Sequence, residues 1–170
     1  MTTVSILREE PRADVGLLAA TAVLVALLDG TFAMAFYSVL LHRVVTGGIW
    51  RSIASHVLGP AALHGGASAA MVGVLIHVTV ATGWTVLFYV ALRTTPALAR
   101  AVRARRAAAA VGAFYGMIIW LSMQYAVVPL GHGAPASPAT FNFWAMLAWH
   151  AAGVGPPIAL MLRRIVPERS

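Results

Sequence analysis

Four polar side chains interrupt long apolar stretches of the sequence, and they are the residues best suited to chemistry. Asp29, His77 and His150 are ionisable, and Gln124 both donates and accepts hydrogen bonds. Ionisable side chains inside a membrane span are costly and commonly mark ion, proton or ligand sites. Each of the four lies in a different apolar stretch, in the half that we expect to face outward. The sequence therefore predicts a binding pocket formed by Asp29, His77, Gln124 and His150.

Several kinds of site are compatible with this set of side chains. A buried polar cluster can simply fix helix packing, because polar groups in a bilayer need partners. It can also form a proton- or ion-linked pocket. His77 and His150 could instead be the axial ligands of a haem b, with Arg43 or Arg51 near the propionates. Together with Asp29, the two histidines are also the ligand set of non-haem iron.

The function that we expect is that of a membrane binding or accessory protein with a buried polar pocket. A haem b electron-transfer protein is the alternative, and a membrane metalloenzyme is the third reading. No serine lies in a nucleophile-elbow or triad pattern, so no catalytic residue is predicted and the sequence favours a non-enzyme. The chain has no cysteine, which excludes disulfides, thiolate metal sites and cysteine nucleophiles.

Apolar helices must position these four side chains, and the composition supports this. The 170 residues are 60% apolar and 10% charged, whereas soluble domains are about 45–50% apolar and about 25% charged. This balance excludes both a single soluble globule and a disordered chain. Four stretches reach the roughly 20 residues that cross a bilayer: 16–41, 67–92, 107–130 and 143–162. We therefore predict an all-α integral membrane four-helix bundle of up-down-up-down topology over 16–164, between an N-terminal segment 1–15 and a tail 165–170.

The basic residues predict how these spans are oriented. All twelve are arginines and the net charge is +7. Ten of them lie before the first span, between the second and third spans, or after the fourth. Arg43 and Arg51 lie on the other side. The positive-inside rule then places both termini in the cytoplasm, and the Arg- and Ala-rich composition suggests a bacterial plasma membrane.

One arginine-rich loop joins the second and third spans. Its basic side chains are expected to attract anionic lipid headgroups, and they are Arg93, Arg100, Arg103, Arg105 and Arg106. Nothing in the sequence supports a nucleic-acid partner. A homo-oligomer or a larger membrane complex is compatible with a bundle of this size.

The segment 49–58 predicts a short interfacial helix on the outer leaflet. Ile49, Trp50 and Ile53 share one helical face with Val57, and Trp50 is expected at headgroup level. The histidines of the outer connections are expected to be solvated; they are His42, His56, His64 and His132.

Small residues predict where the spans approach closely. Gly112-x-x-x-Gly116 in the third span and Ala69-x-x-x-Gly73 in the second are motifs of this kind. In the fourth span, Pro156 and Pro157 remove helical hydrogen bonds, so we expect a break just after His150.

Several strings, taken in order along residues 16–164, resemble a group of short four-span bacterial inner-membrane proteins with no assigned activity. They are Leu28-Asp29-Gly30 with Phe36-Tyr37, Ser52–Gly59, Gly73–His77, Tyr115-Gly116 with Met123, Val128-Pro129-Leu130, and Gly153–Leu160. The resemblance implies the four-helix topology and transfers no catalytic residue. The chain departs from the group at Pro156 and Gln124, where members often have Leu and Asn.

Overall fold

The computed structural model describes residues 10–42, 47–131 and 133–166, and all regular structure in these residues is helical. Four helices are long and apolar enough to cross a membrane: Asp14–Leu40, Gly66–Thr94, Arg105–Leu130 and Phe141–Ile165. They agree with the predicted spans to within three residues at every end. The all-α fold with four potential membrane spans is thereby confirmed, and the chain is a membrane protein by this measure.

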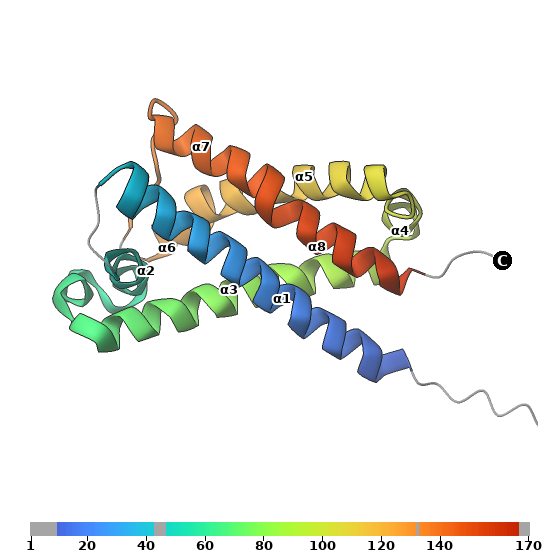
Figure 1. The fold of residues 1–170 in the computed structure, drawn as a ribbon, viewed down its shortest axis with the longest axis horizontal. Coiled ribbons are helices and arrows are strands. Elements are labelled where there is room, and N and C mark those ends of the chain that lie inside the picture. Colours follow the sequence, from blue (N-terminus) through green and yellow to red (C-terminus); the bar gives the residue numbers. More distant parts are fainter. Residues whose placement is uncertain (1–9, 43–46, 132, 167–170) are drawn as a thin grey trace, which may run out of the picture.

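Successive spans run in opposite directions, as Figure 1 shows. The spans are built from α1 (Glu10–Met34) with η1 (Ala35–Leu40); α3 (Gly66–Thr94); α5 (Arg105–Ser122) with η3 (Met123–Val127) and α6 (Val128–Leu130); and α7 (Phe141–Trp149) with η4 (His150–Val154), α8 (Gly155–Leu162) and η5 (Arg163–Ile165). The connections contain α2 (Gly48–Leu58), η2 (Pro60–His64) and α4 (Pro96–Ala101). α2 lies at one end of the bundle, and α4 lies at the other end with the C-terminal end of α8 (Figure 1).

Three of the four spans contain a π-helical turn, namely η1, η3 and η4. The cause is clearest at η4, because Pro156 and Pro157 follow it and have no N–H to donate to the preceding carbonyls. The predicted break after His150 is therefore present, in the form of a widened turn. π-helical turns are rare in proteins, and many of those that occur lie at functional sites. Here η3 contains Gln124, and η4 begins at His150.

Glycines of the third span let it pack directly on the fourth. A Cβ placed on Gly116 would overlap the carbonyl of His150, and one on Gly112 would overlap Gly155 and Pro156. Backbone-to-backbone approach of this kind is how small residues join helices in membranes. The structure thus confirms that Gly112 and Gly116 are packing positions, and it shows that they also hold the backbone of His150 in place.

The short helix α2 forms where predicted, but the expectation that Trp50 lies at headgroup level is wrong. Its indole packs inward, with its ring centroid 5.4 Å from that of His77. The physical reason is the absence of side chains at Gly30 and Gly73. A Cβ on Gly30 would overlap the Trp50 ring, and one on Gly73 would overlap the Trp50 carbonyl. α2 therefore covers one end of the bundle and inserts the Trp50 side chain between the spans.

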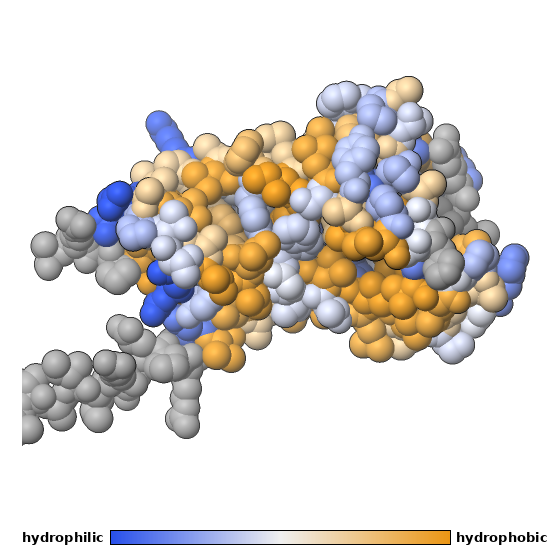
Figure 2. All heavy atoms as spheres, turned by 180° about the vertical axis from the view of Figure 1, so that it is seen from behind, coloured by the Kyte–Doolittle hydropathy of each residue, from blue (hydrophilic) through white to orange (hydrophobic). Residues whose placement is uncertain are grey.

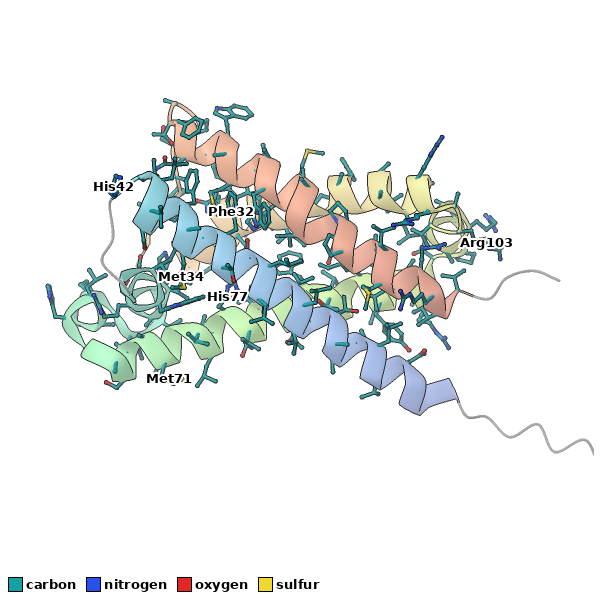
Figure 3. The ribbon with its side chains drawn as sticks, in the orientation of Figure 1. Phe32, Met34, His42, Met71, His77 and Arg103 are labelled. Carbon is teal, nitrogen blue, oxygen red and sulfur yellow. The ribbon has the colours of Figure 1, made fainter. Side chains whose placement is uncertain are left out.

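The surface fits a bilayer environment. Figure 2 shows apolar residues over the middle of the molecule, with hydrophilic residues at the end that carries α4. Arg103 is at that end (Figure 3), and its carbonyl accepts a hydrogen bond from Arg163 Nη1 at 2.6 Å. Arg93 Nη1 lies 3.7 Å from Asp14 Oδ2. Arg43 and the N-terminal Arg8 lie outside the described residues.

Candidate functional site

A cavity of about 400 Å³ lies between the spans beneath α2. The four side chains selected from the sequence, Asp29, His77, Gln124 and His150, all line it. Each comes from a different span, so the bundle collects them only when all four helices are assembled. The cavity lies within the volume range of small-molecule sites, which runs from about 300 to 1,000 Å³.

Asp29 and His150 form the most polar part of the cavity. Asp29 Oδ1 accepts a hydrogen bond of 3.0 Å from the indole Nε1 of Trp149. The same oxygen lies 4.0 Å from His150 Nε2, a distance at which the two groups interact as charges rather than through a direct hydrogen bond. The Asp29 side chain is 18% exposed and that of His150 is 7% exposed, so water screens this interaction only weakly.

The second ring nitrogen of His150 has a partner that settles which nitrogen carries its proton. Nδ1 lies 2.8 Å from the carbonyl oxygen of Met146. A carbonyl only accepts, so Nδ1 is the donor. In the neutral ring, Nε2 is then the unprotonated nitrogen, and it faces the Asp29 carboxylate. With the ring neutral, the two atoms that face each other across 4.0 Å are therefore both acceptors, and neither satisfies the other.

His77 joins α3 to α1. Its Nε2 lies 3.0 Å from the carbonyl oxygen of Ala26, so Nε2 is the donor here. Figure 3 shows the His77 side chain between α3 and α1. The neutral ring is therefore the opposite tautomer to that of His150, with Nδ1 as the remaining acceptor. This bond also connects the first two spans. Ala26 is about one helical turn from Asp29 on α1, so the bond lies close to the level of Asp29.

Gln124 links the cavity to the loop that follows the third span. Its Oε1 accepts a 2.7 Å hydrogen bond from the backbone N–H of Ala136, and only 8% of the residue is exposed. With the oxygen engaged, the remaining polar group of Gln124 is its NH₂. One role of Gln124 is therefore structural, because it holds the loop over this end of the bundle.

Replacing Gln124 with leucine should loosen that loop, because the Ala136 N–H loses its acceptor. A buried donor left without a partner costs about 1–3 kcal/mol, so the Ala136 amide should exchange with deuterium roughly tenfold faster or more. Hydrogen-exchange mass spectrometry of the detergent-solubilised protein measures this. Gln124→Glu keeps a side-chain oxygen and should retain slow exchange. Equal exchange in all three proteins would show that the bond does not hold the loop.

Several residues of the cavity were not selected from the sequence. Trp50, Ile53 and His56 reach it from α2, and Tyr37 reaches it from η1. The prediction that His56 is a solvated loop histidine is wrong, because it is half-buried against the loop glycines, where a Cβ on Gly133 would overlap its ring. The amphipathic pattern of α2 was visible, but the pattern alone does not say whether its apolar face meets lipid or protein.

Indoles surround the polar groups of the cavity. Trp84 and Trp120 line the cavity, and Trp120 packs against His150 with ring centroids 4.9 Å apart. Trp149 stacks on Phe32, with centroids 4.0 Å apart, on the far side of Asp29. Its hydrogen bond to Asp29 links positions 120 residues apart, a separation for which no sequence spacing rule exists.

The structure gives no support to a three-ligand metal site. No group of three His, Cys, Asp or Glu side chains that could hold a metal ion occurs in the part of the chain that is described. His77 turns its Nε2 to the Ala26 carbonyl, while His150 Nε2 faces Asp29, so the free nitrogens of the two rings are not equivalent.

The same contacts do not fit a bis-histidine haem. The free nitrogen of His77 is Nδ1, which is bonded to Cγ, the ring carbon that joins the ring to Cβ and the backbone, so a porphyrin bound there would press on helix α3. Arg51, one candidate for the propionates, donates its Nε–H to the Leu63 carbonyl at 3.0 Å and does not line the cavity. Arg43, the other candidate, lies outside the described residues.

Comparison with protein-family models, with curated proteins and with solved structures found no match. The resemblance to short four-span bacterial membrane proteins therefore stays a prediction.

Proposed function

We propose that this chain is a membrane-embedded binding protein that takes a small ligand into the cavity beneath α2. The observation that carries the proposal is the convergence of one polar side chain from each of the four spans on one cavity of about 400 Å³. Asp29 and His150 each make one hydrogen bond elsewhere, to Trp149 and to the Met146 carbonyl, and the atoms that they turn to each other stand 4.0 Å apart with no direct hydrogen bond.

The binding is proton-linked in this proposal. The proton-accepting Nε2 of His150 faces the Asp29 carboxylate, and a proton held between them neutralises the pair. A ligand that interacts with either group changes how tightly this proton is held, by thermodynamic linkage. His77, His56 and Tyr37 also line the cavity, so they contribute to any pH dependence of binding.

The cellular setting is part of the proposal. Arginines gather at the end of the bundle that holds α4, and the positive-inside rule makes this end cytoplasmic. The cavity then lies in the outer half of a bacterial plasma membrane, with α2 toward the periplasm. The exposed arginines of the α4 loop interact with anionic lipid headgroups at about 1 kcal/mol each near the surface; they are Arg93, Arg100, Arg103, Arg105 and Arg106.

Single-cysteine labelling tests whether the cavity is open to small molecules. Because the chain has no native cysteine, each variant has one reactive thiol. Ala33 lines the cavity, whereas Ala35 lines an apolar groove on the outer face of the same span. A thiol reacts as its thiolate, which forms readily only in contact with water. In isolated membranes, neutral methyl methanethiosulfonate should modify Ala33→Cys within about tenfold of the rate at the exposed loop variant Ala139→Cys. Ala35→Cys should be at least a hundredfold slower.

Equal, slow labelling of Ala33→Cys and Ala35→Cys would show a sealed cavity and contradict the proposal. The same variants report orientation. In intact cells, an impermeant anionic methanethiosulfonate should modify Ala139→Cys, because the loop that contains it is periplasmic in this proposal. Protection of that cysteine until the cells are broken would reverse the assigned topology.

A further inference from the structure

Three ionisable groups of the cavity, those of Asp29, His77 and His150, leave hydrogen-bond acceptors without partners. Donors without partners lie in the surrounding wall and include the Gln124 NH₂ and the buried Trp120 Nε1–H. His150 uses its Nδ1–H on Met146 and leaves Nε2. His77 uses its Nε2–H on Ala26 and leaves Nδ1. All hydrogen bonds and ion pairs of Asp29 within the described residues are made by Oδ1, so Oδ2 has no hydrogen-bond partner there. Three neighbouring groups thus offer lone pairs and no proton.

The charge of the cavity also favours a positively charged ligand. Asp29 is the acidic residue among the described residues that line it, and no arginine is among them. The basic side chains that face Asp29 across the cavity are the histidines: His77 from α3, His150 from η4 and His56 from α2. With these rings neutral, the cavity has a net negative charge and no fixed positive charge to offset it. An anionic ligand would be repelled by Asp29.

The remaining wall suits an organic ligand rather than a bare metal ion. It is mostly apolar and includes the aromatic rings of Tyr37, Trp50, Trp84 and Trp120. Aromatic faces attract cations, and indole does so best. A metal ion would need a set of nearby ligands, and the described residues contain no such group of three.

We propose that the ligand is an organic ammonium ion, with a positively charged nitrogen carried on an apolar or aromatic body. This inference rests on the proposed binding function and specifies its ligand class. The nitrogen lies against Asp29 Oδ2 and donates to the histidine lone pairs, while its body packs on the aromatic wall. The cation takes the place of the proton held between Asp29 and His150, so the two compete for one site.

Charge-matched reagents test the inference at Ala33→Cys. Cationic, neutral and anionic methanethiosulfonates that carry trimethylammonioethyl, hydroxyethyl and sulfonatoethyl groups are compared in isolated membranes. Each rate is normalised to Ala139→Cys. The cationic reagent should react at least tenfold faster than the anionic one. In the Asp29→Asn background this ratio should fall to within about threefold of unity.

A matched substitution controls for general effects of removing an acid from the same helix. Asp14 is also in α1, but it lies outside the cavity and bonds to Tyr89 at 3.0 Å. Asp14→Asn should keep the full preference for the cationic reagent. If Asp29→Asn does not fold, Asp29→Glu serves instead, because it keeps the charge and should keep the preference.

A second measurement addresses the ligand itself. 4-Phenylbutylammonium should slow labelling of Ala33→Cys by the neutral reagent at least fivefold. 4-Phenylbutanol and 4-phenylbutyrate, which share its ring and chain, should slow it less than twofold. Protection by the alcohol as strong as that by the ammonium ion, or no protection by any of the three, would overturn the ligand class.

The two proposals fail in distinguishable ways. If the neutral reagent does not reach Ala33→Cys, the cavity is closed and the binding function itself is contradicted. If the neutral reagent reacts but the cationic one has no advantage over the anionic one, the binding cavity stands and the ammonium inference is wrong.

Discussion

Replacing Gly112 and Gly116 together with alanine is expected to cause the largest loss of stability among simple substitutions in this chain. Each new methyl group would overlap backbone atoms of the fourth span, and backbone cannot move aside as a flexible side chain can. Overpacking costs about 1–3 kcal/mol per site, so the double variant should lose roughly 3 kcal/mol or more. Thermal unfolding in detergent, followed by circular dichroism, measures this as a lower midpoint.

Gly83→Ala is the matched control for that experiment. Gly83 also lies within a membrane span, but a Cβ placed there meets nothing within 4 Å. Alanine is a better helix former than glycine by about 0.5–1 kcal/mol, so Gly83→Ala should be neutral or slightly stabilising. Equal midpoints for the control and the double variant would show that the third and fourth spans do not pack through these glycines.

Replacing His150 with leucine is expected to have the second largest effect, because the Asp29 carboxylate loses the ring that neutralises it whenever the pair holds a proton. Removing one member of a fully buried pair costs about 3–5 kcal/mol. Asp29 is 18% exposed and keeps its Trp149 bond, so a loss of about 2 kcal/mol is expected. Unfolding in detergent again provides the measurement.

The Asp29→Asn background separates this electrostatic effect from lost packing. Asparagine is neutral and keeps an oxygen for the Trp149 indole. In that background, His150→Leu should cost less than about 1 kcal/mol, which gives a coupling energy within the range of about 0.5–3 kcal/mol found for residues in contact. An identical cost in both backgrounds would mean that Asp29 and His150 do not interact.

The spans were predictable from the sequence because a bilayer imposes length and apolarity on each helix separately. The same holds for the Gly112 and Gly116 contact and for the break before Pro156, since each has a local cause. Asp29, His77, Gln124 and His150 could be selected because a polar group within an apolar span is conspicuous. Whether all four face one cavity depends on how each helix is rotated about its axis, and the small residues on the same helix faces indicate that rotation.

What the sequence did not reveal arises from contacts between distant segments. The inward position of Trp50 requires Gly30 and Gly73 on two other helices, and the Trp149 bond to Asp29 joins the first and fourth spans. The histidine tautomers follow from carbonyl partners on α1 and within α7. The Met146 carbonyl is one helical turn from His150, but the other contacts have no sequence spacing, so only the assembled bundle shows which acceptors of Asp29, His77 and His150 remain open.

The most direct test of this account is the position of the ring protons in His77 and His150. Nitrogen-15 NMR of protein labelled at histidine, in detergent and at a pH where both rings are neutral, distinguishes protonated from unprotonated ring nitrogens. The account predicts opposite tautomers, with the proton on Nε2 in His77 and on Nδ1 in His150. A proton on Nδ1 of His77 or on Nε2 of the neutral His150 ring would turn one of the acceptors beside Asp29 into a donor and contradict the claim that these three ionisable groups present lone pairs to a cation.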